Sequence, residues 1–271
     1  MSDYGLADEF VAVCKAVIGR IAPHATILDI THLVRPFAIR EAAVVLARAV
    51  PFLPGSVHLA VVDPGVGSPR RPIALGTSEG SVLVGPDNGL LLPAAAELGG
   101  AWECREIANR GLMLPAISST FHGRDLFAPV AAHLASGVEL SELGPKLAIE
   151  SLVEVPSPVD RLHGDHVHAE VLHVDAFGNL QLSVRPSRLQ EIAVGQGAPV
   201  EVRFSYLWVT APLSPAFADV GEGEWVLTED SSGWLSLSIN RGSAGLTMKA
   251  EAGDEVALGP VGFRCRELDG G

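Results

Sequence analysis

The feature that most constrains the fold of this chain is a change of pattern at Pro156-Ser157-Pro158. Before it, helix-like and strand-like segments alternate, whereas after it short strand-like runs are separated by Gly, Asp and Ser. The first pattern is typical of a layered α/β domain and the second of an all-β domain. We therefore expect an α/β domain over residues 1–155 with a mostly parallel central sheet, a linker over 156–164, and a smaller antiparallel, barrel-like β domain over 165–271.

Hydrophobic periodicity places the individual elements. In the first part, apolar residues at three- and four-residue spacing predict helices over 10–21, 39–50, 89–98 and 125–135. Short runs rich in β-branched residues predict strands over 25–30, 57–63 and 81–85. In the second part, strands are expected over 167–174, 180–184, 199–206, 225–228, 234–239 and 255–258.

Composition excludes several classes of protein. The 271 residues are 48% hydrophobic and 19% charged, which suits a globular chain rather than a disordered one. A formal charge of −13 argues against a surface that neutralises nucleic-acid phosphates, and no apolar run approaches the roughly 18 residues of a membrane helix. Cys14, Cys104 and Cys265 are few and widely spaced, and the sequence shows no charged-then-apolar leader, so we expect a cytoplasmic protein without a disulfide framework.

Three acidic residues, Asp3, Asp29 and Asp63, stand where strands are expected to end. Ligands of layered α/β domains bind beyond the carboxyl ends of strands, where a carboxylate can reach a sugar hydroxyl or a catalytic partner. The simpler interpretation of Asp63 is turn chemistry, because Asp before Pro-Gly favours a turn by itself. Either Arg70 or Arg71 could fold back onto Asp63 across the glycine-rich loop, or both could be solvated.

His122 lies in the sequence FHGRD (121–125), just before a predicted helix. A loop histidine next to glycine can act as a general base or can orient a water molecule. A surface or purely structural histidine is the alternative.

His166 and His168 would share one face of a strand, a spacing that zinc can use. The segment lacks a His-Glu-x-x-His motif, and exposed histidines at a sheet edge explain it more simply. We therefore expect no metal and no cofactor. The absence of a G-x-S-x-G motif also argues against covalent acyl chemistry.

Loops of the β domain combine an aromatic face, an amide and hydroxyls. They are DAFGN (175–179), SSG (231–233) and NRG (240–242). Phenylalanine can stack on an adenine and asparagine can hydrogen-bond its edge, although hairpin turns favour the same residue types.

Seven motifs occur in order across nearly the whole chain: SDYG (2–5), LDITH (28–32), PFAIRE (36–41), VVDPGVG (61–67), GPDNGLL (85–91), FHGRD (121–125) and FGN (177–179). Together they closely resemble the S-adenosylmethionine (SAM) hydroxide adenosyltransferases, adenosine-forming SAM hydrolases related to fluorinases and chlorinases. The resemblance implies that water attacks the ribose 5′ carbon of SAM and expels methionine, giving adenosine. It also implies a homotrimer whose sites lie between the first domain of one subunit and the second domain of its neighbour.

The resemblance also implies roles for single residues. Asp63, Arg70 and His122 match the set that handles the attacking water. Substrate contacts are implied for Asp3 on the ribose hydroxyls, Phe37 and Phe217 against the ligand, Phe177 and Asn179 at the adenine, Asp175, Ser231 and Ser232 at the methionine ammonium and carboxylate, and the backbone near Arg241 at the adenine.

Departures from the halogenating relatives disfavour halide transfer. Those enzymes resemble this chain but carry Tyr and Thr where it has Asp63 and Val66, and the fluorinase carries Ser in place of Gly123. Fluorinase-like enzymes also carry Arg where this chain has Ser232, which implies a weaker or different binding of the methionine carboxylate. The stretch 71–84 is too short for the fluorinase's added loop. The alternatives are a halide-dependent 5′-halo-5′-deoxyadenosine synthase and a non-catalytic protein that binds adenosine or SAM.

Overall fold

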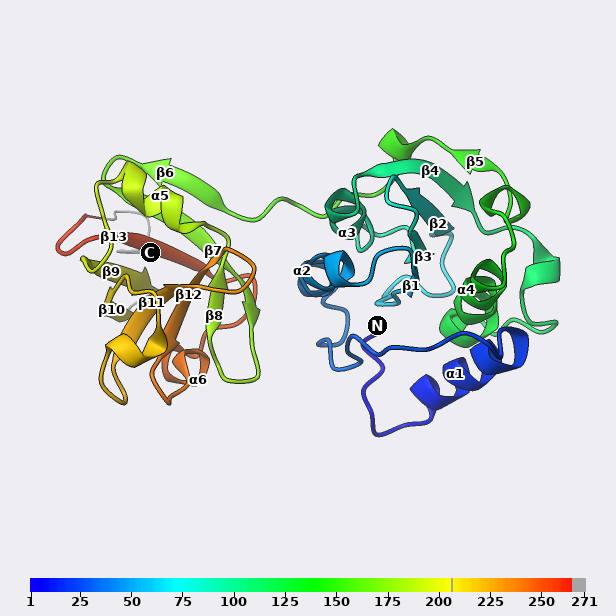
Figure 1. Cartoon of the computed structure of the whole chain (residues 1–271), viewed down its shortest axis with the longest axis horizontal. Helices are drawn as coiled ribbons and strands as arrows, with labels where there is room; N and C mark the ends of the chain where they lie inside the picture. The colour runs from blue at the N-terminus through cyan, green and yellow to red at the C-terminus, as the bar shows by residue number, and fades with distance from the viewer. Residues whose placement is uncertain (206, 265–271) are drawn as a thin grey trace. The chain divides into compact units, whose positions relative to one another are not determined.

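The structure is a computed structural model that describes residues 1–205 and 207–264. The chain divides into two compact units, Met1–Val155 and Pro156–Gly271 (Figure 1). Two expectations fall partly outside the described residues: the end of the strand at 199–206 and Cys265. Cys14 and Cys104 are buried free thiols.

The first unit contains one five-stranded sheet and four α-helices. The strands are β1 (Val57–Leu59), β2 (Pro72–Thr77), β3 (Val82–Pro86), β4 (Ala101–Glu106) and β5 (Lys146–Leu147), and the helices are α1 (Phe10–Ile21), α2 (Ile39–Ala49), α3 (Leu92–Glu97) and α4 (Ala128–Ala135). The sheet order is β1-β3-β2-β4-β5.

The expectation of a mostly parallel sheet is wrong. Among these described strands only β1 and β3 pair in parallel, whereas β2 pairs antiparallel with β3 and β4, and β4 pairs antiparallel with β5. A short turn joins β2 to β3, so the two form a hairpin, which is antiparallel by geometry. Strands β2 and β4 were not predicted from the sequence, so the antiparallel direction of their pairing was not predicted either.

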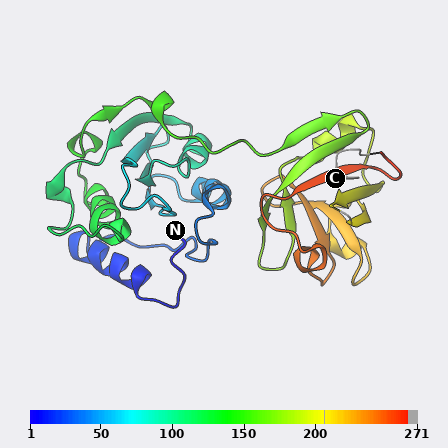
Figure 2. The same cartoon turned by 180° about the vertical axis from the view of Figure 1, so that it is seen from behind.

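Helices cover both faces of this sheet. In β2, Ile73 and Leu75 pack in the cluster that holds α2 and α3, whereas Ala74 between them packs against α4. This alternation is the period of two of a strand whose two faces are both buried. Figures 1 and 2 both show α1 beside α4 on one side of the sheet and α2 and α3 on the other. The layered α/β expectation is thus confirmed in its coarse form.

The expected strand at 25–30 is also wrong. Residues 25–30 have no assigned strand, and Leu28 is 67% exposed. β-branched composition favours an extended backbone, but a strand also needs a neighbour with which to pair.

The second unit is an antiparallel β structure. Its strands are β6 (Asp160–His163), β7 (His166–Val174), β8 (Leu180–Leu182), β9 (Pro199–Phe204), β10 (Leu207–Pro212), β11 (Trp225–Glu229), β12 (Leu235–Ile239) and β13 (Glu255–Pro260), with helices α5 (Pro186–Glu191) and α6 (Ala244–Met248). The order is β10-β9-β13-β7-β8-β12-β11, and β6 pairs with β7. A bridge between Leu213, just after β10, and Leu227 in β11 links the two ends of this order. The barrel-like expectation is confirmed, and β6 lies within the segment expected to be a linker.

In the part of the chain that the structure describes, every helix is too short or too polar to cross a membrane.

Candidate functional site

Asp63 and Arg70 form a buried ion pair in the first unit. Their side chains are 6% and 10% exposed, and Nη2 of Arg70 lies 2.5 Å from Oδ2 of Asp63. Nε of Arg70 also donates to both carboxylate oxygens, at 3.1 and 3.0 Å. Asp63 begins a turn as well, because its carbonyl accepts from the amide of Val66 at 3.2 Å. Asp63 therefore both begins the turn and forms the ion pair with Arg70.

Arg71 is not the partner of Asp63. Its guanidinium pairs with Asp87 at 2.5 Å and donates to the carbonyl of Ser151 at 2.6 Å. The structure therefore decides between the two arginines in favour of Arg70.

His122 completes a side-chain cluster with this pair. Its Nδ1 lies 2.8 Å from Nη2 of Arg70. A guanidinium is always protonated and can only donate, so Nδ1 accepts and the proton of the neutral ring is on Nε2. Burial, and next the charge of Arg70, lower the pKa of His122 below its usual 6.5. The imidazole is therefore neutral at pH 7 and carries its proton on Nε2.

The cluster requires close approach of the loop that follows Asp63 to the loop that precedes His122. Gly67 has φ +78° and a side chain there would come within 2.6 Å of the Ser119 carbonyl oxygen, so glycine is required. His122 directly precedes a π-helical turn, Gly123–Phe127, a distortion common at functional sites. The buried Asp125 in that turn accepts from the amide of Ser118 at 2.8 Å and so fixes the loop before His122.

A cavity of about 580 Å³ opens beside the cluster. It is lined by Asp3, Phe37, Asp63 and His122 among others. Oδ2 of Asp3 accepts from the amide of Phe37 at 3.0 Å, and Phe37 has φ +68° with 69% of its surface exposed. The carboxylate thus holds Phe37 in a backbone conformation that non-glycine residues seldom adopt. Four residues expected in the site meet at one cavity, with Arg70 bonded to two of them.

In the second unit, Asp175, Phe177 and Asn179 form one tight turn. Oδ1 of Asp175 accepts from the amides of Phe177 and Asn179, both at 2.9 Å, and its Oδ2 accepts from the Asn179 side chain at 2.8 Å. Phe177 is 80% exposed. Residues 174–178 line a shallow pocket of about 520 Å³ together with Ser243 and Leu246.

The remaining expected contacts lie in other loops of the second unit. Ser231 and Ser232 are in a turn in which Asp230 accepts from the Ser232 amide at 2.7 Å. Arg241 has φ +59° and pairs with Glu222 at 3.1 Å. Phe217 begins a short 3₁₀ turn, Phe217–Asp219, and is partly exposed.

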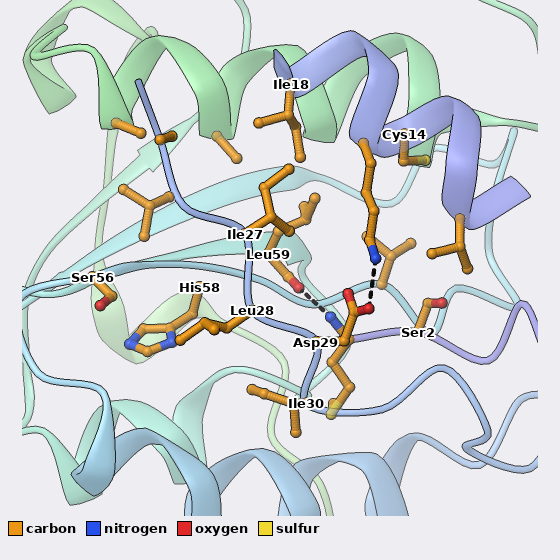
Figure 3. Close-up of a pocket in the computed structure, with 18 of the residues that line it drawn as sticks. Ser2, Cys14, Ile18, Ile27, Leu28, Asp29, Ile30, Ser56, His58 and Leu59 are labelled. Atoms are coloured by element: carbon orange, nitrogen blue, oxygen red, sulfur yellow. Dashed lines mark hydrogen bonds and ion pairs between the residues drawn. The ribbon is translucent and has the colours of Figure 1, made fainter. Parts of the chain in front are cut away.

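Asp29 lies outside this set. It pairs with Lys15 at 2.5 Å and with His32 at 3.1 Å. Figure 3 shows Asp29 beside a second, largely apolar cavity of about 390 Å³, with Ile27 and Leu59 nearby. Of the three acidic residues singled out in the sequence, only Asp3 and Asp63 line the first cavity.

The expectation of exposed edge histidines is wrong. His166 and His168 are 8% and 1% exposed, and their Nε2 atoms lie 3.2 Å apart. β7 pairs with β6 and with β13, and Phe263 stacks on His166 with ring centroids 5.0 Å apart, so the strand is covered. Within residues 1–205 and 207–264, no three or more His, Cys, Asp or Glu side chains are arranged to hold a metal ion.

Two residues beside His122 were not singled out in the sequence. Asp125 is one, and Tyr4, which packs against the turn that carries His122, is the other. Tyr4 meets this turn from a segment more than a hundred residues away, a contact for which a single sequence gives no signal, whereas Asp125 bonds locally to Ser118.

Comparison with known proteins identifies relatives over nearly the whole chain. The profile described as SAM hydroxide adenosyltransferase N-terminal domain matches residues 1–144, and the corresponding C-terminal domain matches residues 169–257. An (R)-S-adenosyl-L-methionine hydrolase of Salinispora tropica is 47% identical, with 95% of each chain covered. A fluorinase of Nocardia brasiliensis is 30% identical, also with 95% of each covered. A crystal structure of an uncharacterized conserved protein from Thermotoga maritima matches with a TM-score of 0.88 and 40% identity, covering 95% of this chain and 97% of that one.

Proposed function

The chain belongs to the SAM hydroxide adenosyltransferase family, and we propose that it is an enzyme that hydrolyses S-adenosyl-L-methionine to adenosine and L-methionine. The observation that carries the proposal is the cluster of the buried Asp63–Arg70 ion pair with His122 at the wall of a cavity. A protein that only binds SAM has no use for a carboxylate, a guanidinium and a neutral imidazole joined in this way.

The reaction determines what these groups must do. Methionine leaves as a neutral thioether and needs no acid, so the chemical difficulty is to hold a water in line with the C–S bond and to remove its proton. A water that attacks carbon becomes positively charged, and a nearby carboxylate stabilises that charge.

The hydrogen bonds of the cluster indicate a different role for each of its three residues. Nδ1 of His122 is occupied by Arg70, and its Nε2 carries a proton, so His122 orients the water as a donor. Asp63 is then the proton acceptor, since a carboxylate has about four acceptor positions and Arg70 does not fill them all. Arg70 bonds to Asp63 and to His122 and so holds the two groups in fixed positions relative to each other.

Substrate contacts complete the proposal. The α/β domain over 1–155 carries the water-handling residues, with Asp3 on the ribose hydroxyls and Phe37 against the ligand. The β domain over 165–271 supplies Phe177, Asn179 and the backbone near Arg241 to the adenine, Phe217 to the ligand, and Asp175, Ser231 and Ser232 to the methionine. Support comes from the exposed Phe177 and from the turn that Asp175 organises.

The assembly we propose is a homotrimer with the ligand between the first domain of one subunit and the second domain of its neighbour. The test is complementation. At SAM concentrations below KM, His122→Ala and Asn179→Ala proteins, each impaired alone, should regain activity when mixed under conditions that let subunits exchange, because some mixed interfaces carry neither change. A fully active monomer by light scattering would contradict the assembly.

We further propose that the reaction uses neither halide nor metal. The Asp63 carboxylate at the cavity wall repels an anionic nucleophile. The protein should therefore be incubated with SAM in halide-free buffer containing a chelator, and adenosine followed by chromatography. Adenosine formation at an undiminished rate supports the proposal. SAM binding without product would indicate a binding protein, a requirement for halide would indicate a halogenating enzyme, and loss with chelator and recovery with zinc would indicate a metal site.

A further inference from the structure

Tyr4 contacts the residues on both sides of His122. Its ring meets that of Phe121 edge to face, with centroids 5.6 Å apart and planes at 80°. On the other side, a Cβ added to Gly123 would overlap the Tyr4 hydroxyl oxygen and would lie 3.0 Å and 3.2 Å from ring carbons Cζ and Cε2. Gly123 does not have a positive φ. Glycine is therefore required at this position to make room for Tyr4, not to allow an unusual backbone conformation.

The ring of Tyr4 is itself held in place. Phe10 packs edge to face on Tyr4 at 6.0 Å and on Phe121 at 5.0 Å, so three rings contact one another. The guanidinium of Arg124 lies over Phe121 at 5.0 Å. Such aromatic pairs contribute beyond their buried area and prefer one geometry. Burial raises the pKa of Tyr4 far above its usual 10, so its hydroxyl remains protonated and neutral.

Tyr4 also stands between the two cavities. Tyr4, Val61 and Gly123 line both the cavity beside His122 and the apolar cavity of Figure 3, so the contact of Tyr4 with Gly123 lies at a wall that the two cavities share. Loss of that contact would loosen the turn that carries His122 and join the reaction site to a second space that water can enter.

We propose that Tyr4 is a positioning residue that clamps Phe121 and Gly123 and thereby fixes the imidazole of His122 against Arg70. The proposal rests on the proposed function and assigns to Tyr4 no contact with the reacting atoms. A displacement of about 1 Å in a catalytic group can reduce turnover about a hundredfold. Tyr4 therefore acts on kcat through His122 rather than on the affinity for SAM.

The test is a double-mutant cycle. Gly123→Ala places a methyl group where the Tyr4 hydroxyl lies and should lower kcat about a hundredfold, with KM for SAM changed by less than about threefold. Tyr4→Phe alone should lower kcat about threefold. The double variant should regain at least about tenfold over Gly123→Ala, because the overlapping oxygen is gone. Gly19→Ala is the control, since nothing lies within 4 Å of a Cβ added there, and its kcat should equal the wild-type value.

A second measurement does not depend on activity. The imidazole signals of His122, identified by their loss in His122→Gln, should titrate at a higher pH in Gly123→Ala and in Tyr4→Leu than in the wild type, because the ring leaves Arg70 and becomes more hydrated. An unchanged kcat in Gly123→Ala, a double variant no better than Gly123→Ala, or an unchanged His122 titration in both variants would overturn the proposal. If the wild-type protein makes no adenosine, the proposed function fails, while the titration still tests the clamp.

Discussion

The two sets of candidate residues are built in opposite ways. In the first unit, the side chains of Asp63 and Arg70 are buried, and Arg70 bonds both to Asp63 and to the partly buried His122. In the second unit, Asp175 uses its carboxylate to hold its own turn together, and the residue that the turn presents, Phe177, is 80% exposed. The first arrangement can control charge and proton position, whereas the second presents side chains for contact with a ligand.

This contrast indicates that the first unit acts on the chemical step and the second unit on ligand binding. Burial strengthens interactions between charges and makes an unpaired charge costly, so a change in the first set should disturb the chemical step. An exposed aromatic ring contributes contact area, so its loss should weaken ligand binding without touching the bond-breaking step. Steady-state kinetics distinguishes the two, because the first effect appears in kcat and the second in KM.

The strongest test of the contrast removes the charge of Asp63. Asp63→Asn keeps the shape of the side chain but removes the proton acceptor, so kcat should fall about a thousandfold, within the range expected for losing a general base. Asp29→Asn is the matched control, because Asp29 is also paired with a cation but lies at the other cavity. Its kcat should stay within about twofold of the wild type. An Asp63→Asn protein that retains a tenth of the wild-type kcat would assign the proton to another group.

Removing the imidazole should have the next largest effect. In His122→Ala the water loses the donor that orients it, and kcat should fall about a hundredfold while SAM binding measured by calorimetry changes little. Proportionate losses of binding and turnover would instead make His122 a substrate anchor and would erase the contrast between the two units.

The pH dependence of kcat tests the same role of His122 in the chemical step. Because the pKa of His122 is lowered from 6.5 by burial and by Arg70, kcat should be flat through neutral pH and fall only on the acid side of 6.5. Protonation there would end the bond from Arg70 and place two cations together. The unfolded chain binds this proton more readily than the folded one, so the contribution of His122 to stability also falls as the pH drops below 6.5. His122→Gln should lack this component of the acid limb; a limb that stays in place would belong to a different residue.

The smallest expected effect belongs to the second unit. Phe177→Ala should raise KM about fivefold with kcat unchanged, in keeping with the roughly 0.5–1.5 kcal/mol of an aromatic stacking contact. Phe52→Ala is the control, since Phe52 is also strongly exposed but lies outside the site. A fall in kcat in Phe177→Ala would show that recognition and chemistry are not separated in this way.

Features that depend on neighbouring residues could be predicted from the sequence better than contacts between distant segments. The helices at α1 and α2, the β domain and the nearness of Asp63 to a following arginine all depend on spacing along the chain. The direction of β2 against its neighbours, the choice of Arg70 over Arg71, and the burial of His168 depend on segments distant in sequence. Apolar strands do not encode their direction, and adjacent arginines are equivalent until Asp87 selects one of them.

In the proposed reaction, a water held by Asp63, Arg70 and His122 attacks the ribose 5′ carbon of SAM. The most direct measurement is the hydrolysis of SAM in ¹⁸O-labelled water, with adenosine and methionine analysed by mass spectrometry. We expect one ¹⁸O atom in the 5′-hydroxyl of adenosine and none in methionine, at a rate that falls about a thousandfold in Asp63→Asn. Adenosine without the label, or labelled adenosine formed as fast in Asp63→Asn as in the wild type, would contradict it.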